Sequence, residues 1–135
     1  MNLQDLIHTM LKKSEQIEED IVQNSILNEL TYRQLNCVEI IYENKNPTIT
    51  ELSEKLGITK PSTTVLIDKL EEKGFVIKVK SDSDRRSAHI HLSDKGECAV
   101  KLHKEIHRKI SDILSENLTG SEKDILVVLL DKALN

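Results

Sequence analysis

Aromatic residues are almost absent from this sequence, which has one phenylalanine, two tyrosines and no tryptophan among its 135 residues. Proteins that hold single-stranded nucleic acid stack its bases on aromatic side chains, so this shortage argues against that class of ligand. No apolar run approaches the length of a membrane span, and the first ten residues lack the basic-then-apolar pattern of a secretion signal. We therefore expect a cytoplasmic protein with no membrane partner.

Motifs for disulfide, metal and catalytic chemistry are scarce as well. Cys37 and Cys98 are far apart and form no Cys-x-x-Cys pair, which argues against a disulfide framework or a zinc ribbon. We expect both to be buried, reduced thiols, with redox sensing by one of them as the alternative. The sequence has no G-x-S-x-G, no phosphate-binding glycine loop and no H-E-x-x-H. We therefore expect that the protein is not an enzyme.

The charge of the chain is unevenly distributed. The formal net charge is −4, which is the wrong sign for a protein that binds DNA. Residues 55–109, however, contain 13 basic and 8 acidic residues, whereas the rest of the chain contains 6 basic and 15 acidic residues. Phosphates respond to a local positive patch rather than to the formal total, so residues 55–109 are compatible with a DNA-binding surface.

Residues 48–74 have the pattern of two helices joined by a tight turn. Thr48 and Glu51 have the spacing of a capping box, and Gly57 can end the first helix in the left-handed conformation. The second helix begins at Thr59 or Lys60, with a proline in its first turn, and ends at Gly74. Its apolar face comprises Thr63, Leu66, Ile67 and Leu70, and its opposite face comprises Lys60, Thr64, Val65, Asp68 and Lys69. This pattern predicts a helix-turn-helix.

Two short strands are expected to follow, over residues 75–80 and 88–92. In the second strand, Ala88, Ile90 and Leu92 alternate with His89 and His91, which places the two histidines on the exposed face. The charged segment 81–87 between the strands predicts the tip of a hairpin. A hairpin that carries arginines beside a helix-turn-helix is typical of a wing, which reaches a DNA minor groove while the helix enters the major groove.

Amphipathic helices are expected on both sides of this module. One runs from Leu3 to about Val22, and another follows the capping box of Thr31 and Gln34. After the wing, a long helix is expected from about residue 94 to residue 117. A last helix opens at Thr119 and is nearly continuous in apolar residues. Such a helix requires more partner surface than one small domain offers, which predicts a homodimer, and the alternative is that these helices close the core of a monomer.

The sequence resembles the MarR family of winged-helix transcription regulators in four stretches: LSEKLGI at 52–58, LEEKGFV at 70–76, DSDRR at 82–86 and LSDKG at 92–96. The resemblance implies a mainly α fold with a small β-hairpin wing and a single domain over residues 1–135. It places a winged helix-turn-helix module at 31–96 and dimerisation helices at 1–23 and 97–135. It further implies a ligand-responsive homodimeric repressor that binds an inverted repeat in double-stranded DNA. A winged-helix module that binds proteins instead of DNA is the alternative.

Contacts with DNA are expected from the second helix of the module and from the wing. The expected residues are Lys60, Pro61, Ser62, Thr63, Thr64, Val65, Lys69, Asp84, Arg85 and Arg86. By resemblance, Arg86 enters the minor groove and Asp84 braces the tip, although such a charged loop is otherwise an ordinary solvated one. Val65 stands where many relatives carry a long polar residue, so a bidentate contact with guanine from this position is lost, whereas its methyl groups can contact a thymine methyl.

His103 and His107 are one helical turn apart, a spacing that can place two imidazoles on one metal ion. The resemblance includes a zinc-sensing branch, which adds a carboxylate from the first helix that Glu18 matches. That branch also has a histidine where this chain has Asn36 or Cys37. Another branch, which regulates fatty-acid synthesis, is similar without requiring a metal, and the two histidines are then surface or pocket-lining residues. The expected cofactor is therefore a small-molecule effector or zinc.

Overall fold

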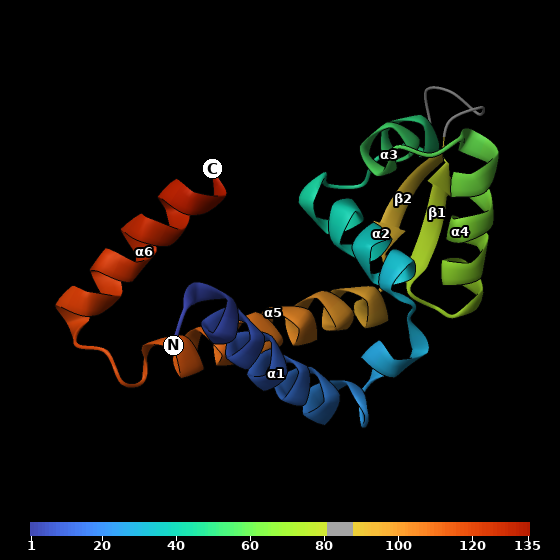
Figure 1. Cartoon of the computed structure of the whole chain (residues 1–135). Helices are drawn as coiled ribbons and strands as arrows, with labels where there is room; N and C mark the ends of the chain where they lie inside the picture. The colour runs from blue at the N-terminus through green and yellow to red at the C-terminus, as the bar shows by residue number, and fades with distance from the viewer. Residues whose placement is uncertain (81–87) are drawn as a thin grey trace. The chain divides into compact units, whose positions relative to one another are not determined.

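The structure is a computed structural model that describes residues 1–80 and 88–135 (Figure 1). The predicted wing-tip residues Asp84, Arg85 and Arg86 lie outside the described residues. The chain forms two compact units, one of residues 1–21 and 105–135 and one of residues 22–104. The described residues form six α-helices and a two-stranded antiparallel hairpin, which confirms the predicted fold class of a mainly helical winged helix-turn-helix.

The second unit contains the winged helix-turn-helix. Its elements are a 3-10 helix (Ile26–Glu29), α2 (Tyr32–Glu43), α3 (Ile49–Leu56), α4 (Lys60–Glu72), β1 (Val76–Lys80), β2 (Ala88–Leu92) and the first part of α5 (Asp94–Ser115). Ser25 caps the 3-10 helix by accepting a hydrogen bond from the backbone N–H of Leu27. The helix α5 ends at Ser115, two residues before the predicted end.

The predicted helix boundaries follow from local capping. Thr31 accepts from the backbone N–H of Gln34 at 3.2 Å, and the Gln34 side chain accepts from the backbone N–H of Thr31 at 3.0 Å. Thr48 accepts from the backbone N–H of Glu51 at 3.2 Å and so begins α3. Gly57 ends α3 with a φ of 67°, a left-handed conformation that glycine adopts without strain.

The core of the second unit is formed by apolar side chains from every layer of the module. The largest that are fully buried include Ile41 of α2, Leu52 of α3, Ile67 and Leu70 of α4, Phe75 before β1 and Ile90 of β2. Burial of one such side chain stabilises a fold by about 1.5–3 kcal/mol. Because α4 contributes to this core along one whole face, its opposite face is fixed toward the solvent.

The hairpin pairs Val76 with Leu92 at one end and Lys80 with Ala88 at the other. The backbone N–H of Ile90 also donates to the oxygen of Pro47 at 2.8 Å, and His89 forms a bridge with Thr48. The segment of Pro47 and Thr48 therefore covers part of β2. The prediction that His89 and His91 are exposed was wrong, because both side chains are half-buried.

The first unit contains α1 (Leu3–Val22), the second part of α5 and α6 (Gly120–Leu134), and neither α1 nor α6 has a buried residue. The bounds of α1 are as predicted, and α6 opens with the predicted capping box of Thr119 and Glu122. Among the described residues, no helix is both long and apolar enough to cross a membrane.

The two cysteines differ in exposure. Cys37 of α2 is fully buried, as predicted, and burial raises the pKa of its thiol to about 12. Cys98 is exposed on α5, so the prediction of a buried thiol was wrong there. The apolar side of α5 in this turn is formed by Ala99 and Val100, which leaves Cys98 on the opposite side.

Candidate nucleic-acid interface

The candidate interface is the outward face of α4. Thr59 caps this helix by accepting from the backbone N–H of Ser62 at 3.2 Å, and Pro61 occupies the first turn, where its missing N–H is not needed. The side chains of Thr63, Leu66, Ile67 and Leu70 are buried. The residues exposed on the other side are Lys60, Pro61, Ser62, Thr64, Val65, Asp68 and Lys69.

Thr63 requires a correction, because we counted it among the DNA contacts. Its side chain is fully buried, and its hydroxyl donates to the backbone oxygen of Thr59 at 2.9 Å. The position also belongs to the apolar stripe of α4, as the helical period of the sequence indicated. Thr63 therefore packs α4 against the core and is not available to DNA.

The remaining groups on this face are suited to phosphates and base edges. Lys60 stands at the N-terminal end of α4, where the helix dipole also favours an anion. Thr64 donates its hydroxyl proton to the backbone oxygen of Lys60 at 3.0 Å, so its oxygen can still accept a hydrogen bond from a base. Val65 is 54% exposed and presents its methyl groups to the solvent. This face combines a cation, a polar group and an apolar group within two helical turns.

An ion pair that the sequence did not predict lies beside this face. Lys78 of β1 donates from Nζ to the carboxylate of Asp68, and Oε1 of Glu71 is 3.8 Å from the same nitrogen. The hydrogen bond to Asp68 raises the pKa of Lys78, and the two carboxylate charges add to this shift. One lysine therefore balances two acidic side chains of α4, which lowers their repulsion toward phosphates.

The predicted zinc ligands are distributed over the two units. Glu18 and His107 belong to the first unit and His103 to the second, where Nδ1 of His103 hydrogen-bonds to the carboxylate of Glu39. Within residues 1–80 and 88–135, no three His, Cys, Asp or Glu side chains gather as metal ligands. Because the three residues are divided between the two units, zinc binding stays a prediction that titration can test.

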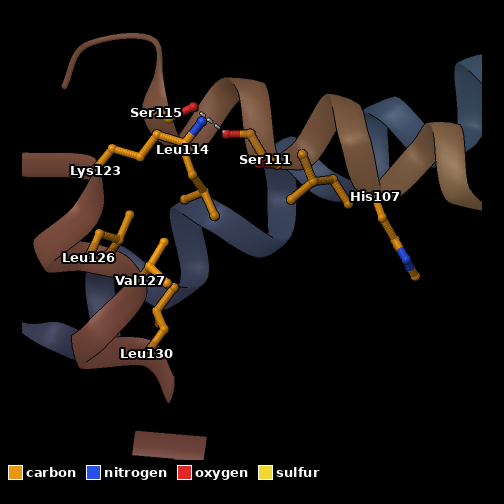
Figure 2. Close-up of a pocket in the computed structure, with 9 residues that line it drawn as sticks. His107, Ser111, Leu114, Ser115, Lys123, Leu126, Val127 and Leu130 are labelled. Carbon is orange, nitrogen blue, oxygen red and sulfur yellow. Dashed lines mark hydrogen bonds between the residues drawn. The ribbon is translucent and has the colours of Figure 1, made fainter. Parts of the chain in front are cut away.

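The first unit has an apolar groove of about 330 Å³ between α5 and α6. Figure 2 shows Leu114 of α5 pointing toward Val127 and Leu130 of α6, and the polar side chains of His107, Ser111 and Lys123 lie at the edges. Other apolar side chains of α6 are exposed too, including Val128 at 65% and Leu129 at 57%. Together with the groove, these side chains form a large uncovered apolar surface.

A second pocket, of about 400 Å³, lies within the second unit, at the end of α2 and the side of β2. It is lined by Ile41, Tyr42, Lys45, Asn46, His91, Leu92 and Glu97. Lys45 and Asn46 both have positive φ angles, 49° and 65°, so this loop adopts a conformation that is uncommon outside glycine. Sequence reasoning did not predict this pocket, because its lining comes from segments that are far apart in the chain.

Comparisons with known proteins agree with this arrangement. The family model described as MarR family matches residues 30–88. An uncharacterised HTH-type transcriptional regulator of Bacillus subtilis, YwhA, is 27% identical over 122 residues, which cover 90% of this chain and 85% of the relative. The transcriptional repressor MprA of Escherichia coli K12 is 32% identical over 114 residues, 81% of this chain and 61% of the relative.

A solved structure gives the same picture of the fold. The chain is similar to FabT of Streptococcus pneumoniae, which was solved in complex with DNA, with a TM-score of 0.74 and 23% identity. The matched region covers 97% of this chain and 92% of the FabT chain. The fold is therefore shared along nearly the whole length of both chains.

Proposed function

We propose that this chain, which belongs to the MarR family of winged-helix regulators, is a homodimeric repressor. We further propose that it responds to a ligand and binds an inverted repeat in double-stranded DNA. The observation that carries the proposal is the outward face of α4, where Lys60, Thr64 and Lys69 are exposed on a helix whose other face is fixed in the core. A helix held in this way can enter the major groove, where the base pairs are distinguishable.

The proposal of a homodimer is supported by the apolar surface of the first unit. Leu3, Leu6 and Leu11 of α1 are 73%, 50% and 58% exposed, and the apolar residues of α6 are exposed to a similar degree. Large apolar side chains left exposed along two helices are a common mark of a protein interface. A two-fold dimer presents two α4 helices to DNA, and recognition helices about one helical turn apart, roughly 34 Å, read an inverted repeat.

Sedimentation of a charged variant tests the dimer and its link to DNA. Leu129→Asp places a carboxylate on the exposed apolar side of α6, and we expect it to shift a micromolar sample toward monomer and to weaken DNA binding. Ser121→Asp is the matched control, because it adds the same charge to the first turn of the same helix, where the helix dipole favours it. A stable monomer that still bound an inverted repeat tightly would contradict the proposal.

The effector is the second part of the proposal. A ligand changes the affinity for DNA only if it binds two states of the protein unequally, so the expected effect is a shift in the spacing of the two α4 helices. Zinc is the first ligand to titrate, because His103, His107 and Glu18 match the zinc-sensing branch. If they bind zinc, replacing both histidines by alanine should abolish any zinc-dependent change in DNA affinity. Binding weaker than about micromolar, roughly −8 kcal/mol, would favour an organic effector.

A further inference from the structure

The C-terminal end of α4 is held by two lysines. Lys73, the C-cap residue of α4, donates from Nζ to the backbone oxygen of Glu29 at 2.6 Å and to Oε1 of Gln34 at 2.8 Å. Lys95, in the first turn of α5, donates to Oε1 of Glu29 at 2.9 Å and to the backbone oxygen of Lys73 at 2.9 Å. We call these four residues, Glu29, Gln34, Lys73 and Lys95, the lysine clasp.

The partners of the clasp are themselves fixed in place. Gln34 is only 6% exposed, and its Oε1 also accepts from the backbone N–H of Thr31 in the capping box of α2. Nζ of Lys95 lies 4.6 Å from the centroid of the Phe75 ring, which is fully buried, at the distance of a cation–π contact. Both ammonium groups are therefore directed at groups of the protein, which distinguishes them from lysines that extend freely toward phosphates.

The place of the clasp in the chain indicates what it does. Glu29 lies in the segment that leads from α1 into the second unit, and Lys95 lies in α5, which leads back to residues 105–135 of the first unit. Both connections between the units thus meet the end of α4 at the same four residues. We propose that Lys73 and Lys95 are positioning residues for DNA recognition, which fix the end of α4 to both connections and so set how its outward face is presented. This inference rests on the proposed binding of DNA.

A substitution at Glu29 distinguishes a positioning role of the clasp from an effect of net charge on DNA binding. Removing an acidic side chain makes the protein more positive, which by itself leaves DNA binding unchanged or strengthens it. If the clasp positions α4, removing the Glu29 carboxylate takes away one of the two hydrogen bonds of Lys95 and weakens the recognition of a specific site. The two explanations therefore predict different results from one substitution, because only the positioning role predicts a loss of affinity.

The experiment uses two duplexes of equal length, one selected by the wild-type protein from a random library and one with the scrambled sequence. We expect Glu29→Ala to lower the affinity for the selected duplex roughly fivefold, the effect of losing one partly exposed ion pair, and to leave the scrambled duplex unaffected. Glu43→Ala, which removes an exposed glutamate of α2, is the matched control and should weaken neither. Lys73→Ala should also weaken the selected duplex, and Lys73→Arg, which keeps a charged donor, should restore most of the loss.

The dependence on salt gives a second readout, which separates loss of the clasp from loss of a phosphate contact. A lysine that contacts a phosphate lowers the salt slope by about one when it is removed, whereas loss of the clasp should leave the slope as it is. All variants are measured at a temperature where circular dichroism shows them folded, and Glu29→Gln replaces Glu29→Ala if the latter unfolds.

Two results would overturn the inference. One is wild-type affinity of Glu29→Ala, or of Glu29→Gln in its place, for the selected duplex. The other is an equal loss on both duplexes with a lower salt slope in Lys73→Ala, which would make Lys73 a phosphate contact. Failure of the wild-type protein to select any duplex would instead overturn the proposed function, and the inference with it.

Discussion

Lys78 of β1 hydrogen-bonds to the carboxylate of Asp68 on the outward face of α4, so the wing and the recognition helix are joined by an ion pair beside the candidate interface. The pair is partly exposed, with 34% of the Lys78 side chain and 54% of the Asp68 side chain accessible. A pair this exposed contributes little to the stability of the fold. Its consequence lies in the charge that α4 presents to DNA.

The first prediction concerns this charge balance. Lys78→Met leaves the carboxylates of Asp68 and Glu71 without their cation, and we expect the affinity for every duplex to fall by about 1 kcal/mol, roughly fivefold. Adding Asp68→Asn to Lys78→Met should restore most of the loss, because it removes one of the two negative charges. Lys101→Met, at an exposed lysine of α5, is the control for a lost positive charge. Equal losses in Lys78→Met and Lys101→Met would leave no special role for the ion pair.

A second prediction concerns the wing. From its place in the sequence between β1 and β2, Arg86 is expected to insert its guanidinium into a narrow minor groove beside each half-site. Arg86→Ala should then cost on the order of 1–3 kcal/mol per half-site, and the loss should be largest on A·T-rich flanks. The measurement is a titration of flanked and unflanked duplexes at one fixed salt concentration. Wild-type affinity of Arg86→Ala for both would show that the wing does not read DNA.

A third prediction concerns the close approach of α5 to Phe75, directly before β1. A Cβ atom on Gly96 would overlap the backbone oxygen of Phe75, so no side chain fits there without moving the backbone. We expect Gly96→Ala to lower the free energy of unfolding by about 1–3 kcal/mol or more, and the melting temperature with it. Gly120→Ala is the control, since nothing lies within 4 Å of its Cβ position. Equal melting temperatures for the two variants would contradict the packing described here.

The fourth prediction separates the two thiols. Cys98 is exposed and should react with an alkylating reagent in the folded protein, whereas Cys37 should react only on unfolding, because it is buried and its pKa is raised. In a Cys98→Ser variant, the free energy of unfolding should also fall as the pH rises from about 9 to about 12. In that window the unfolded thiol has lost its proton, whereas the folded one keeps it. Rapid alkylation of Cys37 in the native protein would contradict its burial.

The outward face of α4 was predictable from the sequence because its determinants are local. Thr59 and Pro61 begin the helix, and the spacing of Leu66, Ile67 and Leu70 decides which side is buried. The same spacing also places Thr63 on the buried face of α4. The prediction that Thr63 contacts DNA was wrong because it disregarded this spacing.

The ion pair and the clasp were not predictable in this way. Lys78 meets Asp68 only because the register of β1 brings it beside α4, and Lys95 meets Glu29 across 66 residues of chain. The half-burial of His89 likewise depends on the segment at Pro47 and Thr48, which pairs with β2 from outside the hairpin. Helix period and capping motifs indicate only which residues are neighbours along the chain. The long-range contacts of Lys78, Lys95 and His89 depend on tertiary packing.

The central claim is that the outward face of α4 reads the sequence of double-stranded DNA. The most direct test is binding-site selection from a random duplex library at fixed salt, with the wild-type protein, Thr64→Ala and Lys69→Ala. We expect the wild type to enrich an inverted repeat, Thr64→Ala to relax the preference within each half-site, and Lys69→Ala to bind the same repeat more weakly with a salt slope lower by about one. Failure of the wild type to enrich any duplex, even at low salt, would contradict the claim and favour a winged-helix module that binds proteins.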